Sequence, residues 1–347
     1  MGHGLMPALV KEAPGPGLVL TERPVPEPGP GQVRARVILA GICGTDGHIY
    51  AWDEWAAGRI RPPVVIGHEW MGVVDAVGPG VEDVRVGERI SAEMHFYCGR
   101  CRPCRTGQPH LCTRLVIGGV DVDGAFASYV VVPAQNVWKL DPAIPDEVGA
   151  IMDPLGNAVH TALEFPLAGA TVAVTGAGPI GLAAVAVARK AGATAIFVTE
   201  VSPERRRLAE RMGADLVLDP SAADPVERVL RETGGEGVDV LLEMSGHPAA
   251  MVQGLQMVRP GGSVAQLGLP SRPLTVDLGR LVVLKGLTVR GIHGRRIFTT
   301  WHQLSEMLRG GLDVRPIITH RFRLEEYGRA FEMLASGRCG KILLEVP

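Results

Sequence analysis

The stretch that most restricts how this chain can fold is TVAVTGAGPIG, residues 171–181. An apolar run leads into the pattern Gly176-x-Gly178-x-x-Gly181, and an apolar helical stretch follows. In a dinucleotide-binding turn the first glycine permits the tight turn, the second lets the backbone approach a pyrophosphate, and the third lets helix and strand touch. The free N–H groups at the helix start face the anion. The stretch therefore predicts a nucleotide site, with a glycine-rich turn of another α/β fold as the alternative.

The regions on either side of this turn predict a two-domain α/β protein. From 156 to 294, apolar runs alternate with helical patterns, which is typical of a doubly wound parallel sheet, the Rossmann arrangement. Residues 1–155 are rich in Gly and Pro, with short β-type runs at 33–39, 72–77 and 127–132, and predict a mostly-β domain. The last region, 295–347, reads as helix, strand, helix and strand. We expect it to pack back on the first domain.

The acid that ends the next apolar run indicates which nucleotide is bound. Glu200 lies 19 residues beyond Gly181, where a carboxylate accepts hydrogen bonds from the adenosine ribose and repels a 2′-phosphate. Arg205, one turn into the following helix, either covers the adenine face or is a solvated helix residue. The sequence therefore favours NAD over NADP.

Four cysteines follow one another closely in HFYCGRCRPCRTGQPHLC, residues 95–112. Four thiolates complete a tetrahedral zinc shell with no open position, so such a metal has a structural role. An iron–sulfur cluster is the rival, although the fourth cysteine does not match the bacterial ferredoxin run. The ligands of this predicted structural zinc are Cys98, Cys101, Cys104 and Cys112.

A second set of metal-binding residue types is spread over three segments. AGICGTDGHIY supplies Cys43, VIGHEWMGVV supplies His68 and Glu69, and IMDPLGNAVHTAL supplies Asp153. Taken singly, each has a structural explanation: Cys43 as a small buried residue, His68 as a core histidine with hydrogen-bond partners, and Asp153 as a helix cap. Together, beside a dinucleotide fold, they match a catalytic zinc that keeps one exchangeable position.

The C-G-T-D-x-H and G-H-E segments, combined with the four-cysteine loop, resemble the zinc-dependent medium-chain alcohol dehydrogenases over essentially the whole chain. The resemblance implies a GroES-like catalytic domain followed by a Rossmann domain. It places the catalytic zinc ligands on Cys43, His68 and Glu69, and the essential acid beside the metal on Asp153. It also implies contacts to NAD from Ile180, Glu200, Arg205, Leu267, Gly268, Leu269, Ile292 and His293.

In such an enzyme, zinc lowers the pKa of the substrate hydroxyl, and the released proton needs an exit. Thr45 can pass the proton through its hydroxyl toward the nicotinamide ribose, and His48 can release it to solvent. CGTDGHIYAWDEW, DPLGNAVHTAL, GIHGRRIFTTW and PIITHRF are similar to the branch that oxidises the 3-hydroxyl of L-threonine to 2-amino-3-oxobutanoate. Candidates for holding the ammonium and carboxylate of that substrate are His95, Arg295 and Arg296, each of which is otherwise a surface polar residue.

Two other functions share these residues. One is a polyol or 2,3-butanediol dehydrogenase, and the other is a non-catalytic nucleotide-binding protein that has kept the fold. A net charge of −2 with 21% charged residues gives no reason to expect nucleic acid or anionic lipid as a partner. Neither an export signal nor a membrane-length apolar run is visible, so we expect a cytoplasmic protein. The resemblance implies a homotetramer.

Overall fold

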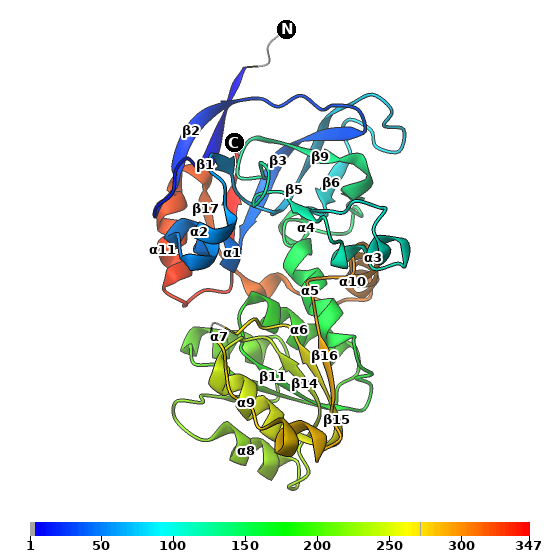
Figure 1. The fold of residues 1–347 in the computed structure, drawn as a ribbon, viewed down its shortest axis with the longest axis vertical. Helices are drawn as coiled ribbons and strands as arrows, with labels where there is room; N and C mark the ends of the chain where they lie inside the picture. The colour runs from blue at the N-terminus through cyan, green and yellow to red at the C-terminus, as the bar shows by residue number, and fades with distance from the viewer. Residues whose placement is uncertain (1–3, 271) are drawn as a thin grey trace. The chain divides into compact units, whose positions relative to one another are not determined.

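The computed structural model describes residues 4–270 and 272–347, and its contacts divide the chain into two units (Figure 1). Unit 1 contains the residues up to Asp153, together with Ile297–Thr299 and Ile318–Pro347. Unit 2 contains Pro154–Arg296 and Thr300–Ile317. In the part of the chain that is described, no helix is both long and apolar enough to cross a membrane.

Unit 1 is built around the long strand β3 (Gln32–Ile42). This strand pairs antiparallel with β5, β9 and β18, and its sheet runs in the order β10-β6-β5-β3-β18-β17. A second sheet has the order β2-β1-β4, and β7 pairs with β8. The strands besides β3 are β1 (Leu5–Lys11), β2 (Val19–Pro24), β4 (Val64–Val65), β5 (Glu69–Val77), β6 (Arg89–Ala92), β7 (His95–Phe96), β8 (Val116–Ile117), β9 (Tyr129–Pro133), β10 (Val137–Lys139), β17 (Ile318–Arg323) and β18 (Lys341–Glu345).

The helices of unit 1 are short. They are α1 (Gly44–Ala51), α2 (Glu54–Arg59), α3 (Arg102–Arg105), α4 (Asp146–Gly149) and α11 (Tyr327–Ala335). The core between sheets and helices is apolar and includes Leu9, Val33, Ile42, Trp70 and Ile342. Most of the stability of such a unit comes from removing these side chains from water.

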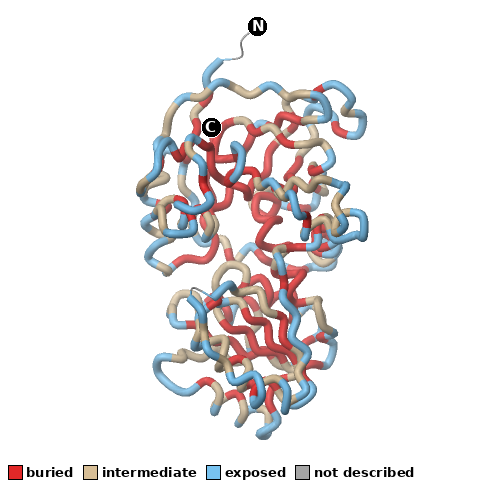
Figure 2. The backbone as a smooth tube through the Cα atoms, viewed as in Figure 1, coloured by how far each residue is buried: buried red, intermediate tan, exposed pale blue. Residues whose placement is uncertain are grey.

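Unit 2 is a six-stranded parallel sheet in the order β13-β12-β11-β14-β15-β16. Its strands are β11 (Thr171–Thr175), β12 (Ala195–Thr199), β13 (Leu216–Leu218), β14 (Val238–Glu243), β15 (Val258–Gln266) and β16 (Thr288–Gly291). The order reverses between β11 and β14, and in such sheets ligands bind at the carboxyl ends of the strands at this switch point. Figure 2 shows buried residues along these strands, as expected where helices cover both faces.

The helices of unit 2 are α5 (Met152–Ala162), which begins at the end of unit 1, α6 (Pro179–Lys190), α7 (Pro203–Arg211), α8 (Pro225–Glu232), α9 (Pro248–Met257) and α10 (Thr299–Arg309). The limits of α6 follow from its sequence. Gly178 is its N-cap and Pro179 fills the first turn, where a missing N–H costs nothing. Arg189 and Lys190 stand in the last turn, where cations interact favourably with the helix dipole.

The C-terminal region differs from the expectation that 295–347 packs on the first domain. Strands β17 and β18 do join the sheet of unit 1 through β3, but Thr300–Ile317, with most of α10, belongs to unit 2. The buried face of α10, with Trp301 and Leu304, explains why this helix needs a partner surface of its own. The sequence pattern also did not predict β16. Its four residues do not form an apolar run, and all four are exposed.

Candidate active site

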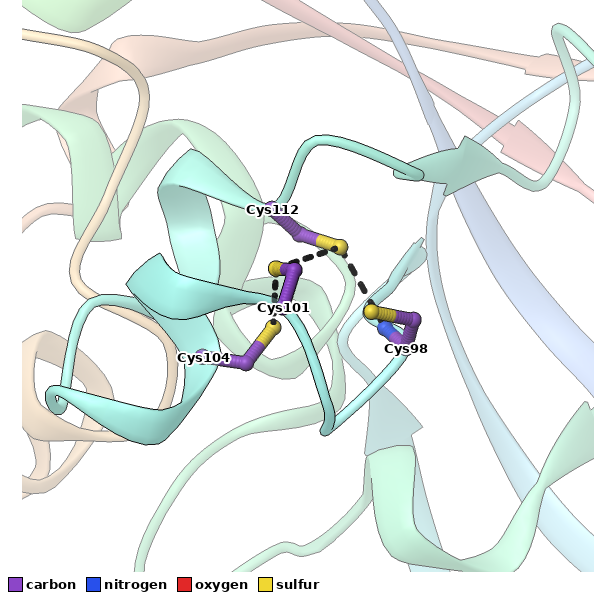
Figure 3. A group of neighbouring side chains, drawn as sticks. All are labelled: Cys98, Cys101, Cys104 and Cys112. Atoms are coloured by element: carbon purple, nitrogen blue, oxygen red, sulfur yellow. Dashed lines mark hydrogen bonds between the residues drawn. The ribbon is translucent and has the colours of Figure 1, made fainter.

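The four cysteines of residues 98–112 point toward a common centre (Figure 3). Their sulfur atoms lie within 4.8 Å of one another. The Sγ atoms of Cys101 and Cys104 are 3.3 Å apart, and those of Cys101 and Cys112 are 3.8 Å apart. A disulfide needs about 2.05 Å, whereas four sulfurs at about 2.3 Å from one tetrahedral zinc lie about 3.8 Å apart. The cluster therefore fits a closed zinc shell.

Backbone amides around this loop favour thiolates, which are the form that binds metal. The amides of Cys98 and Arg114 both donate to Cys112 Sγ, at 3.3 Å. Hydrogen bonds from the amides of Cys104 and Thr113 lower the pKa of Cys101 to about 6. Burial and the neighbouring sulfurs raise the pKa of Cys104 to about 12 instead, so a bound cation is needed to hold all four groups as thiolates.

The predicted catalytic ligand Cys43 is the N-cap of α1, where the chain leaves β3. The Asp46 carboxylate accepts a hydrogen bond from the Cys43 amide at 2.9 Å and so fixes the start of the helix. The Sγ atom of Cys43 lies 3.2 Å from Nε2 of His68, so the two donor atoms converge. Burial raises the pKa of the Cys43 thiol, and the charge of Asp46 raises it further. A bound cation would have the opposite effect, because it binds the thiolate form and so lowers the pKa of the thiol.

The other side of the His68 ring faces Asp46. The Nδ1 atom of His68 and the Oδ1 atom of Asp46 are 3.9 Å apart, and neither atom has a hydrogen-bond partner although both are buried. A metal-ligating histidine is commonly oriented by a carboxylate near its second nitrogen. Asp46 is fully buried, which is costly for an acid unless cations or donors surround it. The arrangement therefore fits a metal bound on the Nε2 side of His68.

Glu69 belongs to the same cluster, because its carboxylate lies within 4.8 Å of the donor atoms of Cys43 and His68. It is also held by a residue that the sequence analysis did not find. The Nζ atom of Lys341, on β18, donates to both oxygens of Glu69, at 2.9 and 2.7 Å, and to the carbonyl of Ile42 at 3.0 Å. Both side chains of the pair are 2% exposed. Burial opposes the charge of Lys341, but the Glu69 carboxylate outweighs it and raises the lysine pKa.

Asp153 lies at the start of α5 and connects this cluster to a second one. Its charge acts on both His68 and Glu69. Its carboxylate is also within 4.8 Å of the donor atoms of Glu93 and His95. Glu93 is fully buried, and its Oε1 atom lies 3.1 Å from Nδ1 of His95. His95, one of the expected site residues, therefore lies beside Asp153, which in turn acts on the metal cluster.

The predicted relay residues Thr45 and His48 lie three positions apart on α1, so their side chains share one helix face. His48 is exposed, as a residue that exchanges protons with solvent must be. Its Nδ1 atom contacts the carboxylate of Asp53, which the sequence analysis also missed.

The glycine turn has the geometry that a bound nucleotide requires. Gly176 has φ +86°, and a Cβ on it would lie 2.8 Å from the Ser245 side chain. A Cβ on Gly181 would lie 2.1 Å from the carbonyl oxygen of Gly176. Gly178 differs, because its φ is −63° and a Cβ there would meet no atom of the chain within 4 Å. No clash within the chain requires a glycine at 178, so the open space above it fits a bound pyrophosphate.

Glu200 is buried at the end of β12, beside this turn. Its Oε2 atom accepts from the Ala177 amide and its Oε1 atom from the Ser202 amide, both at 2.8 Å. The next helix contributes Arg206, which bonds the carbonyls of Glu200 and Val201, at 3.1 and 2.7 Å. Arg205, the expected adenine contact, is half-buried on the same helix.

The remaining expected cofactor contacts lie after β15, after β16 and in the first turn of α6. The amides of Leu267 and Gly268 both donate to the carbonyl of Glu243, at 3.0 Å, and Leu269 is 88% exposed. Ile180 is half-buried in the first turn of α6, Ile292 is buried, and His293 is exposed. All of them belong to unit 2 and follow the carboxyl ends of its parallel strands or the glycine turn.

Both arginines among the candidates for the substrate's ammonium and carboxylate have partners within unit 2. Arg295 is 3% exposed and lies over the Trp301 ring, 5.7 Å from its centroid. Arg296 pairs with Glu164 at 2.6 Å and bonds Nε2 of His160 at 3.3 Å. These contacts favour His95 among the three candidates.

Comparison with known proteins identifies the class that this fold and these sites define. Residues 29–142 match the family described as alcohol dehydrogenase GroES-like domain, and residues 179–310 match the one described as zinc-binding dehydrogenase. The chain belongs to the zinc-binding dehydrogenase family. It is a dehydrogenase with zinc sites and a nicotinamide-nucleotide site.

Within this family, the chain is 49% identical to the L-threonine 3-dehydrogenase of Bacillus subtilis, over 99% of both chains. Further relatives at 47–49% identity carry the same name. Among solved structures, a short chain alcohol dehydrogenase from E. coli CFT073, complexed with NADH, has TM-score 0.91 and 33% identity and covers 99% of this chain and 100% of its own. The 2R,3R-butanediol dehydrogenase of Bacillus subtilis has TM-score 0.88 and 29% identity, with 98% and 99% covered.

Proposed function

We propose that this protein oxidises the 3-hydroxyl group of L-threonine with NAD⁺, giving 2-amino-3-oxobutanoate and NADH, and that a catalytic zinc is required. The observation that carries the proposal is the convergence of Cys43 and His68 beside the acids Glu69 and Asp153, in a chain that also has the nucleotide turn. Full-length similarity to L-threonine 3-dehydrogenases supports the choice of substrate.

The residues of unit 1 provide a metal site and a path for one proton. Cys43 and His68 would hold zinc, with Glu69 as the third ligand and Asp153 beside it, and Asp46 orients the His68 ring. When bound, zinc supplies Lewis-acid chemistry that makes a hydroxyl group easier to deprotonate. Thr45 accepts the proton of the substrate hydroxyl and donates its own onward, and His48 releases a proton to water. Such a relay contributes about 10²–10⁴-fold to the rate.

The cluster of Glu93, His95 and Asp153 supports an amino-acid substrate. Its two carboxylates and one imidazole offer acceptors to a cation, and the α-ammonium group of threonine is such a cation. The amide of Asn136 donates to the carbonyls of Glu93 and His95, at 2.8 and 3.2 Å, and holds this segment in place. We therefore expect the ammonium group to determine selectivity, with threonine favoured over 2-butanol, which lacks it.

The residues of unit 2 position the cofactor. The helix start at Gly178 offers its N–H groups to the pyrophosphate, and Glu200, fixed by two amides, presents a carboxylate beside the turn. A carboxylate there accepts from a ribose diol and repels a 2′-phosphate, so we infer a preference for NAD. NAD⁺, when held there, would supply the hydride acceptor.

A second candidate, oxidation of 2,3-butanediol, is supported by the likeness to a butanediol dehydrogenase structure. The deciding experiment measures NADH formation with threonine, 2R,3R-butanediol and sorbitol, alongside zinc per chain by mass spectrometry. We expect two zinc ions per chain and a kcat/KM for threonine at least tenfold above the other two substrates. A higher value for butanediol or sorbitol would overturn the threonine proposal, and absence of turnover with any alcohol would favour the non-catalytic alternative.

We also infer a homotetramer, in which the edge of the parallel sheet contributes an interface. The edge strand β16 is exposed along its length, and Val289 on it is 48% exposed. Nearby in the chain, Val283 and Leu284 are 70% and 84% exposed. An exposed edge with apolar neighbours is a surface that soluble proteins usually cover. Light scattering of the purified protein tests this: about four times 36.8 kDa supports the inference, and a monomer mass contradicts it.

We infer a cytoplasmic location from the thiol chemistry. Among the described residues no two cysteines are joined by a disulfide, and four of the six converge on one candidate metal site. Such clusters are typical of a reducing compartment, because an oxidising one would join neighbouring thiols. Fractionation of cells that produce the protein tests this proposal.

A further inference from the structure

The segment that joins α1 to α2 brings a carboxylate against the relay histidine. Helix α1 ends at Ala51, and Trp52 turns the chain in the left-handed conformation, with φ 56°. Asp53 follows as the N-cap of α2. Its Oδ1 atom accepts from the Ala56 amide at 3.0 Å, and its Oδ2 atom lies 2.5 Å from Nδ1 of His48.

The two oxygens of Asp53 therefore have separate partners, and the contact of Oδ1 with the Ala56 amide fixes the position of Oδ2. Because the cap bond holds Oδ1 on the helix, the side chain cannot rotate freely, and Oδ2 stays aimed at His48. The hydrogen bond from the Ala56 amide lowers the pKa of Asp53, burial opposes it, and His48 lowers it further. The carboxylate is thus ionised at neutral pH and acts only as an acceptor.

An ionised acceptor at Nδ1 decides which nitrogen of His48 carries the hydrogen. Nδ1–H donates to Asp53, and Nε2 is left with its lone pair. His48 and Asp53 are 58% and 39% exposed, so the pair meets solvent. The Trp55 ring, with its centroid 6.0 Å from that of His48, lies on the same segment.

We propose that Asp53 is a positioning residue for proton release: it holds His48 in the form whose Nε2 atom can accept a proton. This inference rests on the proposed function. In the step, one proton passes from the substrate hydroxyl to the Thr45 oxygen, the Thr45 hydroxyl gives its own proton onward toward the nicotinamide ribose, and Nε2 of His48 accepts one proton from that path. The imidazolium, stabilised by Asp53, then gives one proton to water. Asp53 itself is never protonated.

A simpler role, that Asp53 only caps α2, makes a different prediction for two substitutions. Asp53→Asn keeps the cap, because asparagine is as good an N-cap as aspartate. With Oδ1 retained on the Ala56 amide, the new NH₂ group faces Nδ1 of His48 and donates to it. The hydrogen of the neutral ring then moves to Nε2, which can no longer accept. Asp53→Ala loses the cap but leaves His48 free to sample both forms.

The two variants should therefore rank in opposite orders for thermal stability and for turnover. For thermal stability we expect wild type and Asp53→Asn to be close, with Asp53→Ala lower. For kcat with threonine at pH 7 we expect about a tenfold loss in Asp53→Ala and about a hundredfold loss in Asp53→Asn, within the range of such relays. KM for NAD⁺ and zinc content should stay within twofold of wild type. Glu54→Gln removes the same charge one residue later, where the structure gives no contact to His48, and should retain kcat within twofold.

Nitrogen-15 NMR of the histidine rings measures the same effect without turnover. The His48 signals, assigned by their loss in His48→Gln, should show Nδ1–H in wild type and Nε2–H in Asp53→Asn. Equal ring forms in the two proteins, or a kcat that falls in the same order as stability, would overturn the proposal. If wild type does not oxidise threonine, the proposed function fails, while the NMR comparison still decides the Asp53–His48 contact.

Discussion

The buried pair of Lys341 and Glu69 makes the C-terminal strand part of the metal site. Substituting Lys341→Met keeps the length and apolar stem of the side chain but removes its charge. Both members are 2% exposed, so Glu69 would be left in the core without its cation, either as an unpaired charge or, since burial raises its pKa, as a protonated acid. Removing one partner of a buried pair costs about 3–5 kcal/mol, because the other charge is uncompensated. The carbonyl of Ile42 also loses its donor.

This cost corresponds to a large change in melting temperature. Unit 1 comprises roughly 190 residues, and in a unit of this size each 1 kcal/mol shifts Tm by about 2–4 °C. We therefore expect Lys341→Met to lower the Tm of unit 1 by about 6–20 °C. Calorimetry in a chelating buffer measures it, since bound zinc would stabilise the folded state by mass action and mask the loss.

The double variant Glu69→Gln with Lys341→Met provides the control. Neither position then carries an unpaired charge, and replacing a whole buried pair by neutral groups is often nearly neutral. We expect the double variant to be more stable than Lys341→Met alone, with a coupling energy above about 2 kcal/mol. A Tm for Lys341→Met within 2 °C of wild type, or additive effects in the cycle, would refute the buried-pair argument.

Three further outcomes are expected. Gly178→Ala should leave Tm within about 1 °C but weaken NADH binding at least tenfold in a fluorescence titration, because the added Cβ would occupy only the space of the ligand. Gly176→Ala, at φ +86°, should instead lower the stability. A stability loss in Gly178→Ala with unchanged NADH binding would contradict the role given to Gly178. Cys101→Ser should lower Tm by several degrees and zinc content by one ion with KM little changed, because closed zinc shells contribute folding energy; a changed KM at unchanged Tm would contradict a structural site. Cys43→Ser should remove the other zinc and nearly all turnover while NADH affinity by fluorescence stays within twofold, and retained turnover would exclude Cys43 as a catalytic ligand.

Local sequence patterns predicted the sites that are formed by residues close together in the chain. The glycine turn spans six residues, and the four-cysteine loop spans 15, so their geometry follows from the chain itself. The strand order of unit 2 could be expected as well, because alternating strands and helices permit few parallel arrangements. The division of the last region between the two units could not, since the apolar residues of α10 and β18 indicate that each is buried but not which surface each covers.

Residues that support the site from a distance gave no local signal. Lys341 is 272 residues from Glu69 and looks like an ordinary lysine at the start of a strand. Its burial could have been suspected only from its place among apolar residues in KILLEV. Asp53 lies only five residues after His48, but their contact depends on the left-handed turn at Trp52, which residue types alone do not predict.

Glu243 shows the same principle in the nucleotide unit. It is fully buried at the end of β14, where an unsatisfied carboxylate would be very costly. Its oxygens accept from Thr175 Oγ1 at 3.3 Å, the Gly246 amide at 3.1 Å and Gln266 Nε2 at 2.7 Å, so one acid joins the ends of β11, β14 and β15. A Cβ on Gly268 would lie 2.3 Å from it, which explains that glycine. The three strand ends lie beside the point where the sheet order reverses, so a buried acid there fixes the spacing of the loops that follow these strands.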